Sequence, residues 1–444
     1  MPEITKSILI FLPAMVLGAA AHAADTQLST SFAATAEKSQ AQLTDRSGQN
    51  TAGSTGPTDT DQLQDAVTDY QNSIKQLQSA HGAFYDQISE ELVGMGLAYR
   101  NLGQDKQAIN AFNRSLHINR INHGLYDASQ LPILELIIQT NTALADWKAL
   151  DQNYHYLYWV NRRIYGDHSP RLLPVINRLG RWHLHAYSQA VDSVPFNHLL
   201  AAEQLFQDAV QIIDKNFGPD DPRQITPLYG LVMTDYQIAS NATVTVVHAD
   251  MRFTSINSSL MDQMQDDERN RQELISQCYR DGKKALLKVV DIYSKNTDLP
   301  VAAHGMAQVM LGDWYLIFDR RNAASDTYAE AYSTLQQSGM QKQELDRLFG
   351  KPQSLPDLQL PMDDQTQQDN SSNVDDDNYV IAKFDVSKSG WARNIEIVEA
   401  SPADNKSLQR RAKNRIRTTR FRPRLENGQP VATAGVNIKY TDHE

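Results

Sequence analysis

The stretch LVGMGLAYRNLGQDKQAINAFNRS, residues 92–115, lies inside one unit of a repeat that runs through the middle of the chain. Three glycines mark the period of this repeat, because Gly82, Gly124 and Gly166 follow one another at equal steps of 42 residues. Gly218 comes after a longer step of 52 residues, which indicates an insertion in that unit. A period of this length is typical of stacked helix pairs, and we expect each glycine to end one pair with a positive φ angle.

The spacing within the units resembles the tetratricopeptide repeat (TPR). In that family a small residue lies where the two helices of a pair cross closely, and bulky residues lie at the ends of that contact. The resemblance covers roughly residues 63–340, with an irregular excursion expected near 240–272. Its three copies are Leu92, Met95, Gly96, Tyr99, Gly103, Ala108, Phe112 and Ser115; Leu179, Gly180, Ala202, Phe206 and Ala209; and Leu311, Gly312, Tyr315, Ala324, Tyr328 and Ala331.

Such helix pairs stack into a superhelix in which each pair contacts only its neighbours. The TPR resemblance implies a concave surface, lined by the first helix of each pair, that holds an extended peptide. Asparagines there would hydrogen-bond a peptide backbone and arginines would bind carboxylates. The alternative is that these side chains are only the solvated faces of helices. The candidates by repeat position are Arg100, Asn101, Asn141, Asn177, Arg181 and His185.

From residue 378 the periodicity changes from helical to alternating. YVIAKFDV (379–386) alternates apolar and polar residues like a half-buried strand, and NIEIV (394–398) forms a second short strand. Residues 405–417 predict a helix with Leu408, Ala412 and Ile416 on its inner face, and residues 436–440 a last strand. The predicted order is β-β-α-β, a small α+β domain spanning residues 378–444.

This segment resembles the C-terminal domain of the TonB family. The resemblance implies one helix packed on a three-stranded antiparallel sheet. Members of that family bind a short segment of outer-membrane receptors by adding it as a strand at the sheet edge. The matching residues are Phe384, Gly390, Ile395, Val398, Ser401, Pro402, Phe421, Arg422, Pro423, Gly428, Pro430 and Val431.

Two binding surfaces follow for this domain. A small sheet leaves an edge strand whose backbone groups lack partners, and we assign that edge to Val436, Asn437, Ile438, Lys439 and Tyr440. A basic patch in the same domain is predicted to be a docking surface for acidic receptor loops or lipid head groups. The alternative is that basic residues merely solvate the helix or pair with the acidic residues 375–377. The patch comprises Arg410, Arg411, Arg415, Arg420 and Arg422.

The ends of the chain indicate export. Residues 1–23 resemble a signal peptide, with Lys6, an apolar run over 7–20 and a small-x-small cleavage pattern at 21–23. The run is shorter than the roughly 20 residues that span a bilayer, so we expect cleavage and a periplasmic location, with an uncleaved inner-membrane anchor as the alternative. Residues 24–62 predict a disordered leader, and residues 341–377 an acidic, proline-containing linker.

Several classes of function lack support in the residues. The formal net charge of −11 argues against nucleic acid as a partner. The one cysteine, Cys278, falls in an apolar helical pattern that predicts a buried thiol. His183 and His185 point away from each other on a helix, and the twelve histidines show no metal-ligand motif. We therefore expect no catalytic residue, no cofactor and no metal.

The sequence thus predicts a mostly α protein, a TPR-like α-superhelix followed by a TonB-like α+β domain. We expect a non-catalytic periplasmic adaptor whose partners are proteins: an outer-membrane receptor segment at the sheet edge and a peptide or protein in the TPR groove. Two alternatives stay open, namely a TonB-type energy transducer with an uncleaved anchor, and an envelope enzyme or enzyme accessory with a site in residues 240–272. Contact with a membrane would be peripheral or through the anchor. A homodimer paired through the sheet edge is a further possibility.

Overall fold

The four glycines that mark the repeat each follow the end of a helix with a positive φ angle, as predicted. The angles are 94° at Gly82, 91° at Gly124, 84° at Gly166 and 97° at Gly218. The structure is a computed structural model that describes residues 59–191, 194–244, 258–356 and 378–441. These form two compact units, which we call the N-terminal unit (59–216) and the C-terminal unit (217–441). The predicted signal peptide lies outside the described residues.

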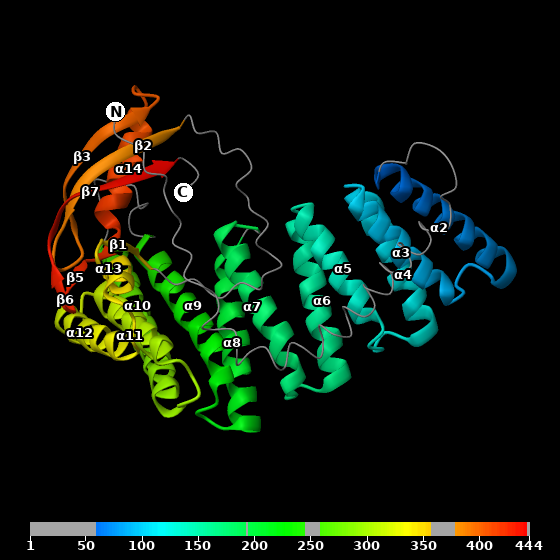
Figure 1. The fold of residues 1–444 in the computed structure, drawn as a ribbon, viewed down its shortest axis with the longest axis horizontal. Helices are drawn as coiled ribbons and strands as arrows, with labels where there is room; N and C mark the ends of the chain where they lie inside the picture. Colours follow the sequence, from blue (N-terminus) through cyan, green and yellow to red (C-terminus); the bar gives the residue numbers. More distant parts are fainter. Residues whose placement is uncertain (1–58, 192–193, 245–257, 357–377, 442–444) are drawn as a thin grey trace. The chain divides into compact units, whose positions relative to one another are not determined.

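The N-terminal unit consists of helices joined by short turns, which succeed one another in chain order (Figure 1). The first of them begins at Asp59, so the last residues of the predicted leader belong to a helix. Val67, Tyr70 and Ile74 of that helix are buried, which explains why it is ordered so early in the chain. The helices are α2 (Asp59–His81), α3 (Gln87–Asn101), α4 (Asp105–His123), α5 (Gln130–Ala143), α6 (Trp147–Tyr165), α7 (Leu173–Ser188) and α8 (Phe196–Phe217), with a short 3-10 turn η2 (Pro170–Leu172).

The close helix contacts implied by the TPR resemblance are present. A methyl group added at Gly180 of α7 would lie 2.7 Å from Cζ of Phe206 in α8, so only glycine fits there. Gly96 of α3 meets the ring of Phe112 in α4 in the same way. Phe112 and Phe206 are both buried. The small residue of one helix therefore receives the aromatic ring of its partner, and the helices are TPR-like.

The C-terminal unit begins with the same architecture. It contains η3 (Pro222–Gln224), α9 (Ile225–Val244), α10 (Ser258–Lys295), α11 (Val301–Ile317) and α12 (Arg321–Gln337). Gly312 of α11 packs against Tyr328 of α12, where an added methyl group would lie 2.6 Å from the ring. The described parts of the predicted irregular excursion at 240–272 are helical, which corrects that prediction: residues 240–244 end α9 and residues 258–272 belong to α10, while 245–257 lie outside the described residues. Cys278 of α10 is buried, as predicted.

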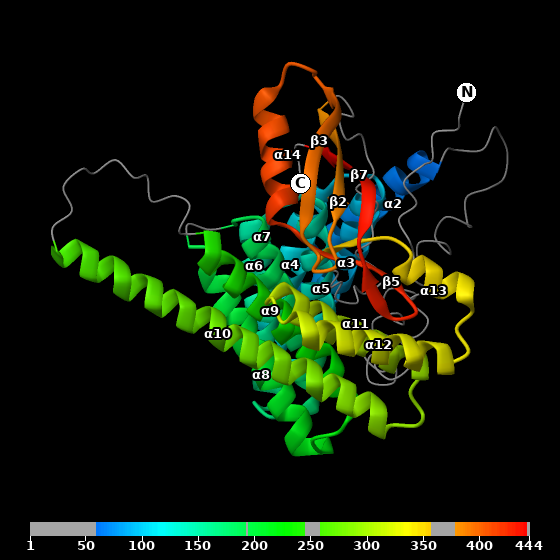
Figure 2. The ribbon, with the colours of Figure 1, turned by 90° about the vertical axis from the view of Figure 1, so that its left-hand side faces the viewer.

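The TonB-like domain has the predicted helix-on-sheet arrangement. Its three-stranded antiparallel sheet has the order β3-β2-β7, from β2 (Tyr379–Val386), β3 (Ala392–Ser401) and β7 (Thr433–Thr441). Helix α14 (Lys406–Thr418) covers one face of this sheet (Figure 2). Its buried residues are Leu408, Ala412 and Ile416, the three that the spacing predicted. Short strands β4 (Arg420–Arg422), β5 (Arg424–Glu426) and β6 (Gln429–Val431) connect α14 to β7.

The first part of the predicted linker is folded, which corrects the sequence-based boundary at 341. Residues Lys342–Phe349 form helix α13, and Gln353–Leu355 form strand β1, which pairs with β4. Leu345, Phe349 and Leu355 are buried in one cluster with Tyr328 of α12 and Leu425 of β5. This apolar contact holds the segment in place despite its polar composition. Residues 357–377, which include the acidic run, lie outside the described residues.

Candidate functional site

Strand β7 forms one edge of the three-stranded sheet. It pairs on one side with β2, and no strand in the described part of the chain pairs with its other side. From Val436 to Thr441 the pairing is continuous, beginning at Phe384↔Val436 and ending at Tyr379↔Thr441. All five residues that the sequence assigned to the edge lie in this regular segment. Their backbone is therefore placed where an added strand would bind.

The side chains of β7 alternate between the two faces of the sheet. Val436 and Ile438 pack against the core beneath α14, and Tyr440 is buried next to Leu408. Asn437 and Lys439 are exposed on the other face, where the Lys439 ammonium lies 4.6 Å from the ring centre of Tyr379. One face of β7 is therefore packed against the core of the domain, and the two polar side chains on its other face are open to solvent.

The opposite edge, β3, is a poorer template for an added strand. Its pairing with β2 shifts register twice, between Ile381 and Ala382 and between Lys383 and Asp385. Asn394 within β3 has a φ of 53°, which bends the strand locally. Bulges of this kind are a common means of protecting a sheet edge from pairing with other chains. The pairing of β7 with β2 has one such shift, between Phe384 and Val386, and none from Val436 to Thr441, so the geometry favours this segment of β7.

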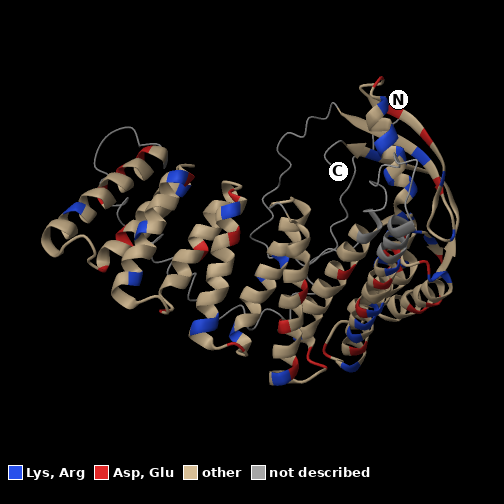
Figure 3. Ribbon diagram, turned by 180° about the vertical axis from the view of Figure 1, so that it is seen from behind, with Lys and Arg blue, Asp and Glu red and all other residues tan. Residues whose placement is uncertain are grey.

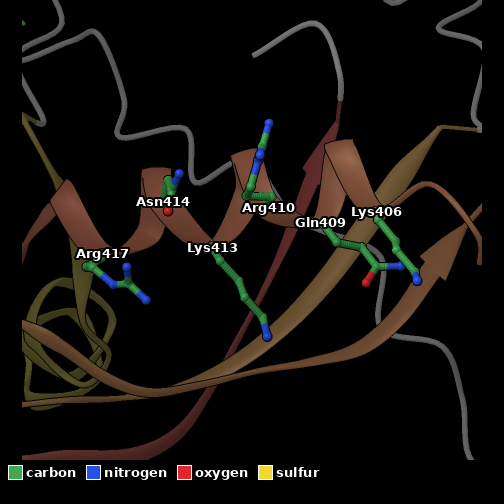
Figure 4. Close-up of a pocket in the computed structure, with 6 residues that line it drawn as sticks. All are labelled: Lys406, Gln409, Arg410, Lys413, Asn414 and Arg417. Atoms are coloured by element: carbon green, nitrogen blue, oxygen red, sulfur yellow. The ribbon is translucent and has the colours of Figure 1, made fainter. Parts of the chain in front are cut away.

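Helix α14 carries most of the predicted basic patch. Figure 3 shows Lys and Arg gathered along this helix, and Figure 4 shows the residues that line a shallow pocket of about 300 Å³ on its surface. Arg410 belongs to this pocket, whereas Arg411 and Arg415 are exposed but do not line it. The pocket residues are Lys406, Gln409, Arg410, Lys413, Asn414 and Arg417. Four of these six side chains are cationic, a composition suited to anionic groups.

Arg420 and Arg422 are not part of an exposed patch, which corrects their assignment. Arg422 is 4% exposed and donates from Nε to Oδ1 of Asp313 in α11 at 2.8 Å, while its Nη2 donates to Oδ2 of the same carboxylate. Arg420 donates to the carbonyl oxygen of Ser389 at 2.9 Å and to Asp319 at 3.2 Å. Burial lowers the pKa of Arg420. Both arginines therefore attach the sheet domain to the last TPR-like helix pair.

The six groove candidates occupy different environments in the N-terminal unit. Asn101 is exposed, and Arg100, Asn177 and Arg181 are half-buried, with Arg100 donating to Gln139 of α5 at 3.1 Å. Asn141 is only 3% exposed, which removes it from any surface that a peptide could reach. His185 packs edge-on against Trp147 at 5.4 Å, and burial lowers its pKa. The candidates thus form no single row of free polar groups.

One ion pair that was not predicted from the sequence joins the first helices of two consecutive helix pairs. Arg178 of α7 donates to both carboxylate oxygens of Glu135 in α5, at 2.6 and 2.7 Å. This pairing raises the pKa of Arg178 despite the opposing effect of burial. Arg178 is the residue directly after Asn177, a predicted groove position. Its partner Glu135 is on another helix, so the spacing within α7 does not reveal the pair. The pair links two consecutive repeats.

Comparisons with known proteins gave one family match and several structural alignments. Residues 375–441 match the family described as Gram-negative bacterial TonB protein C-terminal. The structure of BtubC (BKLC) from P. vanneervenii aligns with a TM-score of 0.36 at 11% identity, over 64% of this chain and 91% of that chain. The structure of the Podosopora anserina putative kinesin light chain nearly identical TPR-like repeats aligns with a TM-score of 0.33 at 16% identity, over 56% of this chain and 96% of that chain. A comparison with curated proteins found no match.

The chain is therefore a helical-repeat protein with a small sheet domain attached to its last repeat. Its particular combination is TPR-like repeats followed by a domain that matches the TonB C-terminal family over residues 375–441. Among the described residues, no helix combines the length and apolar character needed to cross a membrane.

Proposed function

We propose that this chain is a non-catalytic adaptor of the periplasm. In this proposal β7 takes up a segment of an outer-membrane receptor as a fourth strand, while the helical repeats bind a second protein. The observation that carries the proposal is the continuous, one-sided pairing of β7 from Val436 to Thr441. The match of residues 375–441 to the TonB C-terminal family supports the choice of receptor.

Strand addition explains the chemistry of this edge. Backbone hydrogen bonds to an added strand provide affinity, and side chains that alternate along it provide specificity. The exposed Asn437 and Lys439 offer an amide and an ammonium to such a segment. The cationic pocket on α14, in the same domain, adds long-range electrostatic attraction for an acidic partner. A neutral or acidic extended peptide is the ligand that these features fit best.

The attachment of the domain to α11 suits an adaptor. Because Arg422 and Arg420 pair with Asp313 and Asp319, the sheet domain and the last helices form one body. A segment captured at β7 is then held in a fixed position relative to that last repeat. This is a different design from a docking domain on a free tether.

A photo-crosslinking amino acid at Asn437 tests the proposal. We expect it to crosslink an outer-membrane receptor in intact cells, because this exposed position lies on the strand that receives the partner. The matched control is Glu396, which is exposed on β3 at the other edge of the same sheet. Crosslinked partners are identified by mass spectrometry.

The result expected is receptor capture from position 437 and not from position 396. Equal capture from both positions would mean that the contact is not specific to β7. Capture of only a second copy of this chain would favour a homodimer paired through the sheet edge. Absence of any outer-membrane protein at position 437 would contradict the proposal.

The family match also favours a second candidate, a TonB-type energy transducer that keeps residues 1–23 as a membrane anchor. Intact-mass analysis of the exported protein separates the two. The adaptor proposal expects a chain that starts at Ala24, because residues 21–23 form a cleavage pattern. A mass that includes residues 1–23 would favour the transducer. A catalytic role for residues 240–272 has no supporting observation in the described part of that segment.

A further inference from the structure

A cluster of metal-ligand side chains lies inside the N-terminal unit, away from the proposed binding surfaces. Asp151 of α6, His183 of α7 and His198 of α8 each offer one ligand atom, and these atoms lie within 4.8 Å of one another. The two histidine rings meet through their Nδ1 atoms, which are 2.8 Å apart. Three consecutive helices thus bring a carboxylate and two imidazoles to one point.

The surroundings of the cluster orient these groups. His183 and His198 are 3% and 6% exposed, and Asp151 is half-buried. Asp151 accepts a hydrogen bond from Nε1 of Trp182 at 2.8 Å, which fixes the carboxylate in place. A carboxylate has lone pairs enough to accept this bond and still bind an ion. Hydrogen bonds of this type to a ligand are a regular feature of protein metal sites.

A further histidine stands at the solvent side of the cluster. His155 is one helical turn after Asp151, and its Nε2 lies 3.8 Å from Oδ1 of that carboxylate. Its ring packs edge-on against His183 at 5.1 Å between centroids. His155 is exposed, so the cluster has a histidine neighbour that is open to solvent. It is also placed to become a fourth ligand through rotation of its side chain.

We infer that Asp151, His183 and His198 form a binding site for a divalent transition-metal ion of the zinc class. Two imidazoles and one carboxylate are a ligand set that zinc uses in proteins, with the remaining position taken by water or another side chain. Zinc–nitrogen bonds of about 2.0–2.1 Å in tetrahedral geometry place two ligand nitrogens roughly 3.3 Å apart. The two Nδ1 atoms need to separate by only about half an ångström to reach that distance. Ion binding then replaces the hydrogen bond between the rings.

Ion binding would hold the three helices α6, α7 and α8 together. The repeat departs from its equal steps in the unit that contains α7, α8 and the connection between them, because Gly218 follows Gly166 after 52 residues rather than 42. His183 and His198 lie on either side of this longer connection. An ion held by both would fix the crossing of α7 and α8 and tie it to α6. This inference does not depend on the proposed adaptor function.

The test uses the full, untagged chain, stripped of metal with a chelator. We expect calorimetric titration to show one Zn²⁺ bound per chain, and Co²⁺ to give the visible absorption bands of a tetrahedral site. We expect zinc to raise the unfolding temperature, because an ion that binds only the folded state stabilises it. His198→Gln and Asp151→Asn should each weaken zinc binding more than about 100-fold, since changes outside the first ligand sphere alone cost roughly 10–100-fold.

Two comparisons keep the test decisive. His117→Gln is the control, because His117 is an exposed histidine on α4 of the same unit that packs against Phe84, and it should leave affinity unchanged. Asp151→Asn is expected to keep the bond from Trp182, so it reports on binding even if His198→Gln folds poorly. Zinc binding that survives Asp151→Asn and His198→Gln, or that His117→Gln weakens equally, would overturn the site. Failure to bind zinc or cobalt at one equivalent would overturn it as well.

Discussion

Arg422→Met is expected to lower the free energy of unfolding of the C-terminal unit by about 3–5 kcal/mol, because it leaves the Asp313 carboxylate buried without its cation. Asp313 is 5% exposed and Arg422 is 4% exposed, so water cannot easily replace the lost partner. Tyr328 donates to Oδ1 of Asp313 at 2.7 Å but carries no charge to compensate it. Hydrogen exchange of the β1 and β4 amides, combined with denaturant unfolding, measures the effect.

A double variant shows whether the loss comes from the unpaired charge. Arg422→Met combined with Asp313→Leu should recover part of the stability, because no buried charge remains, although the buried Tyr328 hydroxyl loses its acceptor. Arg411→Met, on the exposed face of α14, should change stability by less than about 0.5 kcal/mol. If Arg422→Met behaves like Arg411→Met, the ion pair does not hold the domain.

The Arg422→Met variant also separates two properties of the sheet domain, its attachment to α11 and its ability to take up an added strand. Residues 436–441 pair with β2 through contacts that do not involve Arg422. Loosening the attachment to α11 should therefore leave the β7 edge formed. An adaptor needs both properties, since one captures the partner and the other fixes its position. Crosslinking from Asn437 in the Arg422→Met background would show capture without that fixed position.

Local patterns in the sequence were enough to predict much of this fold. The equal steps of Gly82, Gly124 and Gly166 indicate helix ends, because a positive φ at the end of a helix favours glycine over other residues. Alternation over 379–386 matches β2 from its first residue to its last. Gly180 and Phe206 were identified as a small and a bulky position through the TPR resemblance. In each case the physical cause acts within one or two neighbouring elements.

What the sequence could not provide depends on distant residues. Arg420 and Arg422 stand among other basic residues, and their burial is decided by Asp319 and Asp313, about one hundred positions earlier. His183 is close in sequence to His185, but the two side chains point away from each other on α7. The structure instead brings His183 to His198, on the next helix, and to Asp151, on the preceding one. No spacing rule for a single helix contains that information.

Phe206→Ala is expected to lower the free energy of unfolding of the N-terminal unit by about 3–5 kcal/mol, the usual range for loss of a buried aromatic ring. Phe206 is 1% exposed and lies against Gly180, which has no side chain with which to fill the cavity. The stability of this unit is followed by hydrogen exchange of α7 and α8 amides. A loss well below this range would mean that the helices close up around the missing ring.

Gly180→Ala decides whether the pair acts as one contact. In the natural protein the new methyl group would lie 2.7 Å from Cζ of Phe206, inside the roughly 3.5–4.0 Å at which carbon atoms pack, so a cost of about 1–3 kcal/mol is expected. In the Phe206→Ala background the ring is gone, and the same change should instead stabilise by about 0.5–1 kcal/mol, because alanine favours helix over glycine. Equal effects in both backgrounds would contradict a direct contact. If the effect of Gly180→Ala changes sign between the two backgrounds, position 180 needs glycine in order to leave room for the Phe206 ring. That is the physical reason for this pair of residues in a TPR-like repeat.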